Sequence, residues 1–238
     1  MFGGSGYATG GTPSYLNDLW MYDGTNWTWL SGSNVVSQFG VYGVQGTADS
    51  ANTPGARTFI NFGFDNSTQT LYLFGGKGYG ESGAVGGLSD LWKFQNGQWT
   101  WLSGPKTSDA AEQRGPKGVS SSSYYPGPRM SAAVWASSAG DVYISGGYYQ
   151  VNGARYFMSD TWKYSAGQWS WVDGSSSPAL NDSTLGSALA SDALGYGAGV
   201  FIPFLFDQSA NTGYFFGGQG IDTNGQYGLR DSVWKYQP

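Results

Sequence analysis

Short runs of alternating apolar and polar residues recur along this chain at a fixed spacing. In each period, one apolar run ends in a pair of glycines. The second glycines of these pairs are Gly4, Gly76, Gly147 and Gly218. A later segment in each period places an acidic residue shortly before a tryptophan, at Trp20, Trp92, Trp162 and Trp234. A period of roughly 70 residues indicates a repeat architecture in which each copy is one structural unit.

Each period divides into four segments with the composition of β-strands. The first follows a Pro-Gly turn from Pro54 and from Pro126, and is looser from Gly195. The second ends in the glycine pair, the third holds the Asp-x-Trp sequence, and the fourth holds two tryptophans separated by Thr or Ser. Runs rich in Trp, Tyr, Phe and Val between Gly, Asn, Asp and Ser predict strands. Because short turns join strands one to two and three to four, we expect antiparallel four-stranded meanders.

Alternation along a strand assigns neighbouring side chains to opposite faces of the sheet. Trp92 and Phe94 therefore share one face, while Leu91 and Lys93 share the other. One four-stranded meander cannot bury both of its faces, so successive meanders must pack on one another. Radial packing of such sheets gives a β-propeller.

The order of these segments resembles the kelch motif: apolar run, Gly-Gly, variable loop, Asp-x-Trp-x-Tyr, short turn and Trp. The resemblance covers nearly the whole chain in four copies, two of them complete. It implies an all-β fold, a β-propeller of four-stranded antiparallel kelch blades in a single domain over residues 1–238. The blades would occupy residues 1–32, 54–104, 126–174 and 195–238.

The first and last copies depart from the pattern. The first lacks its first strand, and the fourth lacks its last strand and shifts its acid to Asp231. The fourth copy also has a glycine-rich stretch where the second and third have Arg57 and Arg129. The two end copies thus overlap instead of completing one blade. Three alternatives stay open: a ring with two thin blades, an excerpt of a longer ring, or open edges that associate with another subunit.

The composition agrees with an all-β protein and argues against nucleic acid and membranes as partners. Forty glycines and 17% aromatic residues, with only 11% charged residues, are unlike a helical chain. The formal net charge is −5 and no basic cluster occurs, so nucleic acid is not an expected partner. The longest apolar stretch, residues 198–206, contains a proline and is too short to span a bilayer, so we expect no membrane insertion.

The chain contains no cysteine and no histidine. This excludes thiol catalysis, Ser-His-Asp chemistry and metal sites that use either residue. We therefore expect no catalytic residues, no metal and no cofactor. Kelch-type propellers include copper radical oxidases, but that copper site needs His ligands and a Cys-linked Tyr. A glycosidase that uses only carboxylates remains the enzyme alternative, although no pair of acids stands out.

The repeated acids and glycines have structural explanations. Glycine at a strand end suits a backbone bend, and no Gly-Lys-Ser/Thr phosphate loop follows any pair. The repeated acids are expected to accept hydrogen bonds from backbone N–H groups of turns, since no calcium-loop pattern occurs. They are Asp18, Asp90, Asp160 and Asp231.

The long connections between strands carry most of the candidate binding residues. Tyrosine among Gly, Ser and Asn is typical of adaptable recognition loops on a rigid scaffold. The candidate partner-binding residues are Tyr7, Tyr79, Tyr124, Tyr125, Tyr148 and Tyr149; Tyr15, Tyr42 and Tyr196 lie in the same connections. The alternative is that these tyrosines cover the tops of the blades.

Three Asn-x-Ser/Thr triplets, at Asn26, Asn66 and Asn181, are possible N-glycosylation acceptors. With the low charge they favour an extracellular or cell-surface protein. We expect a non-catalytic interaction or assembly module whose partner is protein, through self-association or other blades of a longer chain, or glycan. A filament or surface subunit is the structural form of this hypothesis, and a lectin-like glycan binder is the alternative.

Overall fold

A computed structural model describes the chain except residues 10, 178, 181–198, 201–203, 222–226 and 238. Every regular element in the described part is a strand, and the all-β prediction is confirmed. All strand pairs are antiparallel, and they form several separate sheets. No helix in the described part is long and apolar enough to cross a membrane.

The first two repeats each form one sheet. Sheet 1 is a meander of β1 (Phe2–Gly6), β2 (Ser14–Tyr22) and β3 (Trp27–Ser31). Sheet 2 contains β4 (Arg57–Thr58), β5 (Asn61–Asp65), β6 (Thr70–Gly78), β7 (Gly86–Gln95) and β8 (Gln98–Ser103). In sheet 2 both β4 and β5 pair with β6.

The third and fourth repeats form the rest of the array. Sheet 3 contains β9 (Ser120–Ser121), β10 (Ala133–Ala136), β11 (Val142–Ser145), β14 (Thr161–Ser165) and β15 (Gln168–Asp173). A small sheet beside it contains β12 (Tyr148–Val151), β13 (Ala154–Phe157) and β16 (Ala179–Leu180). Sheet 4 contains β17 (Gly199–Val200), β18 (Phe204–Asp207), β19 (Thr212–Ile221) and β20 (Tyr227–Tyr236).

The predicted first strand of repeat 2 is broken in the structure. Phe59 has a φ of 53°, which separates β4 from β5, and the matching Ser131 of repeat 3 has a φ of 55°. The Ser131 N–H donates to the Phe59 carbonyl at 2.8 Å, so the two breaks contact each other between neighbouring repeats. This hydrogen bond stabilises a backbone conformation that residues with side chains seldom adopt.

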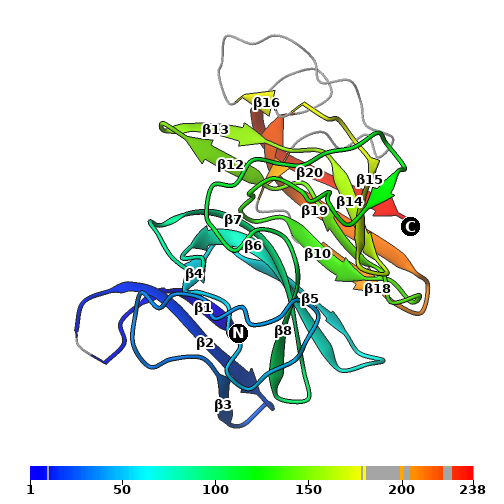
Figure 1. Ribbon diagram of the computed structural model, residues 1–238. Helices are drawn as coiled ribbons and strands as arrows, with labels where there is room; N and C mark the ends of the chain where they lie inside the picture. The colour runs from blue at the N-terminus through cyan, green and yellow to red at the C-terminus, as the bar shows by residue number, and fades with distance from the viewer. Residues whose placement is uncertain (10, 178, 181–198, 201–203, 222–226, 238) are drawn as a thin grey trace.

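The sheets succeed one another in chain order, and consecutive sheets share hydrophobic clusters (Figure 1). Between sheets 1 and 2 the buried members are Phe2, Leu19, Tyr42, Leu73, Trp92 and Trp99. Between sheets 2 and 3 they include Phe74, Leu91, Val134, Ile144, Trp162 and Trp169. Between sheets 3 and 4 they are Ala133, Trp135, Tyr143 and Phe215. We call the face of a sheet that packs on the next sheet its forward face, and the opposite face its rear face.

The glycine pairs lie at these junctions. Gly75 has a φ of 63°, and a Cβ there would lie 2.7 Å from the carbonyl oxygen of Arg129 in the next repeat. The N–H of Gly76 donates to the same carbonyl at 2.9 Å. Gly3 has a φ of 54° and a similarly close approach to the Arg57 carbonyl. The pair is therefore needed for the positive φ and for contact between repeats.

The described sheets do not close into a ring. Among described residues, no strand pairing and no hydrophobic cluster joins sheet 1 to sheet 4. Among the described residues, sheets 2 and 4 meet at turns, where the Gln208 side chain donates to Asp65 and accepts from the N–H of Asn66. The first and last sheets are the ends of the series (Figure 1).

Candidate interaction sites

The repeated Asp-x-Trp sequence forms a buried hydrogen-bonded unit. The Asp90 carboxylate accepts the indole N–H of Trp92 at 2.7 Å and both terminal nitrogens of Arg57 at 2.6 and 2.8 Å. Asp160 accepts from Trp162 and Arg129 in the same way. The expectation that these acids bind turn N–H groups is wrong here, because a buried arginine and the indole occupy their oxygens.

These ion pairs have the electrostatics of structural groups. Burial alone would raise the pKa of Asp90, but the charge and hydrogen bonds of Arg57 outweigh it and the pKa is lowered. Burial raises the pKa of Tyr42 well above its usual value, and the negative charge of Asp90, which accepts its hydroxyl at 2.7 Å, adds to the effect. Both groups keep their ordinary protonation states at neutral pH.

Two equivalent cover loops, residues 40–53 and 112–125, precede the first strands of repeats 2 and 3. In each loop a glycine N–H donates to the carbonyl of the second tryptophan on the last strand of the sheet. Gly46 donates to Trp101 on β8, and Gly118 donates to Trp171 on β15. Tyr42 in the first loop packs against Trp92 and Trp101. In the second loop Arg114 takes this place.

Arg114 occupies the position in the second cover loop that Tyr42 occupies in the first. Its guanidinium carbon lies 4.8 Å from the ring centres of both Trp162 and Trp171. It pairs with Glu112 and Asp160, while its Nη1 is buried and has no partner among the described residues. The substitution of arginine for tyrosine therefore brings charge to a place that is aromatic in the preceding repeat.

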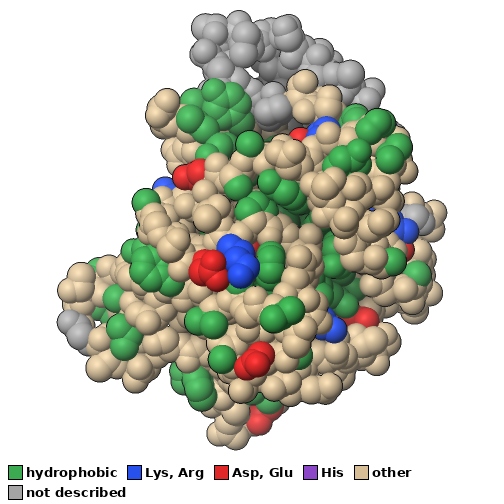
Figure 2. Space-filling model, in the orientation of Figure 1, with side chains coloured by type: hydrophobic (Ala, Val, Ile, Leu, Met, Phe, Trp, Pro, Cys, Tyr) green, Lys and Arg blue, Asp and Glu red, His purple; other side chains and the backbone are tan. Residues whose placement is uncertain are grey.

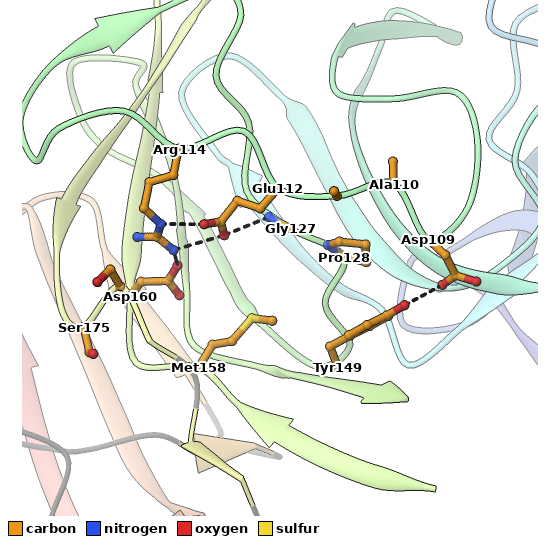
Figure 3. A pocket seen from close by; sticks show the side chains of 12 residues that line it. Asp109, Ala110, Glu112, Arg114, Gly127, Pro128, Tyr149, Met158, Asp160 and Ser175 are labelled. Atoms are coloured by element: carbon orange, nitrogen blue, oxygen red, sulfur yellow. Dashed lines mark hydrogen bonds and ion pairs between the residues drawn. The ribbon is translucent and has the colours of Figure 1, made fainter. Parts of the chain in front are cut away.

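A cavity of about 290 Å³ opens beside Arg114. Figure 3 shows Glu112, Arg114 and Asp160 on one side, Tyr149 and Asp109 on the other, and Met158 between them. The Tyr149 hydroxyl donates to Asp109 at 3.1 Å, and burial together with this acid raises the pKa of Tyr149 to about 12. A second cavity of about 270 Å³ also borders Asp109 and Tyr149. The pair thus separates two neighbouring hollows.

The structure disperses the other candidate tyrosines. Tyr7 is exposed, and Tyr79 packs its ring against Tyr15 and Phe39. Tyr124 and Tyr125 are partly buried against the cluster between sheets 2 and 3. Tyr148 is buried beside Tyr149 in sequence, and Tyr42 is fully buried. Of the candidate set Tyr7, Tyr79, Tyr124, Tyr125, Tyr148 and Tyr149, only Tyr149 lines the described cavities.

The glycosylation triplets at Asn26 and Asn66 lie apart from the cavity. Asn26 and Asn66 are exposed in turns between strands, whereas Asn181 and Tyr196 lie outside the described residues. Within the described ranges, no group of three or more acidic residues is placed to hold a metal ion. Charged side chains are few and scattered on the face that Figure 2 shows.

The rear face of sheet 1 exposes large aromatic side chains. Trp27 is 54% exposed, whereas the equivalent Trp99 of sheet 2 is 1% exposed and Trp169 of sheet 3 is fully buried. Trp29 and Tyr22 on the same face are also about half exposed. The pairing of Trp20 with Trp29, Trp92 with Trp101 and Trp162 with Trp171 establishes that these positions are equivalent.

The forward face of sheet 4 is open in the same way. Phe216 and Val233 are opposite each other on β19 and β20 and are 40% and 61% exposed. The equivalent pairs, Phe2 with Leu19 and Phe74 with Leu91, are buried. Leu205 on β18 adds a further exposed apolar side chain.

Sequence reasoning singled out neither the two open faces nor Arg114 and Glu112. The sequence shows that Trp27 occupies the same repeat position as Trp99 and Trp169, and only the structure shows that it is exposed. The signal for the cavity was a break in the repeat. Tyr42 and Arg114 stand the same number of positions before Arg57 and Arg129.

Comparison with known proteins adds little to this description. No family model and no curated protein matches the chain. A solved structure of YjhT is similar with a TM-score of 0.44 and 12% sequence identity, over 91% of this chain. The chain spans 58% of that protein's length.

Proposed function

We propose that the chain is a non-catalytic assembly module, a kelch-type β-propeller array that docks the open faces of its first and last sheets onto protein. The observation that carries this proposal is the exposure of Trp27, at a position that is core in sheets 2 and 3. Contiguous exposed apolar side chains mark interaction surfaces, and tryptophan is enriched among residues that dominate binding energy. Trp27, Trp29 and Tyr22 together form such a surface.

Other features support the remaining parts of the proposal. The kelch-type propeller is supported by the recurrence of the same hairpins, glycine pairs and Asp-Trp units in successive sheets that pack face to face. The non-catalytic role is supported by the absence of His and Cys and by the engagement of Asp90 and Asp160 in ion pairs. An extracellular location is supported by the exposed Asn26 and Asn66 triplets.

Sedimentation velocity of the purified chain tests the assembly function. We expect the wild type to associate in the micromolar range and the double variant Trp27→Ser, Trp29→Ser to associate at least about 30-fold more weakly, as loss of a dominant binding residue requires. Tyr7→Ser is the matched control, because Tyr7 is exposed but lies on neither open face. A wild-type chain that stays monomeric up to about 100 μM, weaker than ordinary specific association, contradicts the proposal.

Glycan binding is a second candidate function, and the cavity beside Arg114 favours it. Its walls combine an aromatic ring, Tyr149, with Met158 and with hydrogen-bonding groups on Glu112 and Arg114. Such a mixture of apolar area and a few polar groups suits a small polar ligand. A glycan array probed with wild type, Tyr149→Ala and Tyr79→Ala tests this candidate. Binding that is lost in Tyr149→Ala and kept in Tyr79→Ala supports this site, and equal binding by all three chains contradicts it.

A further inference from the structure

The junctions inside the chain follow one packing rule. Each junction between sheets 1 and 2 and between sheets 2 and 3 places a tryptophan from the rear face of the later sheet on a phenylalanine of the earlier one. Trp99 packs edge-on against Phe2 with ring centres 5.4 Å apart, and Trp169 packs against Phe74 at 5.9 Å. The phenylalanine is in each case opposite a leucine on the next strand, Leu19 or Leu91.

The junction between sheets 3 and 4 differs, because no tryptophan from sheet 4 packs at the equivalent position in the described part of the chain. Sheet 4 has no described strand that carries a counterpart of Trp99. The forward pair of sheet 3 is Ser145 and Thr161, whose buried hydroxyls hydrogen-bond to each other at 2.9 Å. An apolar Phe-Leu pair thus lies under a tryptophan at the first two junctions, and a polar pair occupies the same position at the third.

Sheet 4 presents an apolar pair of the first kind, Phe216 with Val233, and it is exposed. Sheet 1 carries Trp27 at the position equivalent to Trp99 and Trp169, and Trp27 is also exposed. The two open faces are thus the two halves of one junction. Both belong to this chain, and the described contacts do not bring them together within it.

We infer that the partner of each open face is a second copy of this chain, bound head to tail, with Trp27 of one copy seated on Phe216 and Val233 of the other. This inference rests on the assembly function proposed above and specifies its partner. The contact is heterologous, because two different surfaces meet, so it leads either to a closed pair or to a longer array. A two-fold contact of like faces would instead bring tryptophan against tryptophan, an arrangement that neither of the first two junctions uses between sheets.

Two single-face variants test the inference. Trp27→Asp blocks the rear face of sheet 1, and Val233→Asp blocks the forward face of sheet 4; both positions are more than half exposed, so the fold tolerates the charge. Val44→Asp places the same charge at a position that is 71% exposed and on neither face. Sedimentation velocity is measured for each variant alone and for an equimolar mixture of Trp27→Asp with Val233→Asp.

We expect each blocked variant alone to be monomeric and Val44→Asp to associate like the wild type. The mixture should form a one-to-one dimer, because each variant supplies the face that the other lacks. Restored association cannot arise from misfolding, so the mixture keeps the test independent of variant stability. Either blocked variant associating alone, or a mixture that stays monomeric, overturns the head-to-tail contact. Wild-type association that the Trp27→Ser, Trp29→Ser variant weakens would leave the assembly function standing in that case.

Discussion

Trp99 and Trp27 share one repeat position, and replacing each by alanine should affect folding very differently. Trp99 is buried against Phe2, Trp92 and Phe94, with the Phe94 ring centre 5.1 Å away. Deleting a buried tryptophan side chain costs about 3–5 kcal/mol of unfolding free energy. Trp27 keeps about half of its surface exposed, so by area its loss should cost roughly 1–2 kcal/mol.

Urea unfolding followed by far-ultraviolet circular dichroism measures both free energies without relying on tryptophan emission. The protein is kept dilute, below its association range, because assembly would add to the apparent stability of the wild type. Equal losses for Trp99→Ala and Trp27→Ala would refute the reasoning, because Trp27 would then lie in a core of the isolated chain. A loss under about 1 kcal/mol for Trp99→Ala would refute the packing of Trp99 between sheets.

Three further variants test the interior of the array and the cavity. Asp90→Asn leaves the buried Arg57 guanidinium without an opposite charge and should cost about 3–5 kcal/mol in urea unfolding. Asp18→Asn weakens an indole hydrogen bond and an interaction with the exposed N-terminal amine, and should cost less than about 1.5 kcal/mol. Gly75→Ala should destabilise more than Gly97→Ala, because both have positive φ but only Gly75 meets a neighbouring carbonyl; equal losses in thermal melts would contradict this. Tyr149 has a pKa raised from 10 to about 12, so the folded state favours the neutral phenol. Wild type should lose stability relative to Tyr149→Phe as pH rises between these values, and parallel pH profiles would contradict it.

The strands were predictable because their signals are local. Period-two alternation and short turns predict the hairpins β5–β6 and β7–β8, and the structure has both. The break of the first strand at Phe59 and Ser131 was not predictable. Its positive φ accompanies a hydrogen bond between neighbouring repeats, which no pattern within one repeat contains.

The candidate site was less accessible to sequence reasoning. A tyrosine in a long connection can serve either in recognition or in packing, and the sequence does not distinguish the two roles. In the structure Tyr42 and Tyr148 are buried, whereas Tyr149 lines a cavity. The cavity depends on where the second cover loop crosses sheet 3, which is a property of tertiary packing. Aligning the two cover loops would nevertheless have shown the replacement of Tyr42 by Arg114.

The repeat pattern also concealed the difference between equivalent positions. Trp27, Trp99 and Trp169 are alike in sequence, and their shared context suggests a shared role in the core. Their exposure differs because burial at this position requires a phenylalanine from the preceding sheet. Only the arrangement of sheets shows that Trp27 lacks that neighbour within the described part of the chain.

Thiol cross-linking between copies tests the head-to-tail contact most directly, because the chain has no cysteine of its own. Thr25→Cys marks the turn that leads into Trp27, and Lys235→Cys lies on the same face of β20 as Val233; both positions are exposed. With a short bismaleimide, we expect a covalent dimer when the two variants are mixed and little product from either variant alone. Equal cross-linking of Thr25→Cys with itself, or no product in the mixture, would contradict the contact.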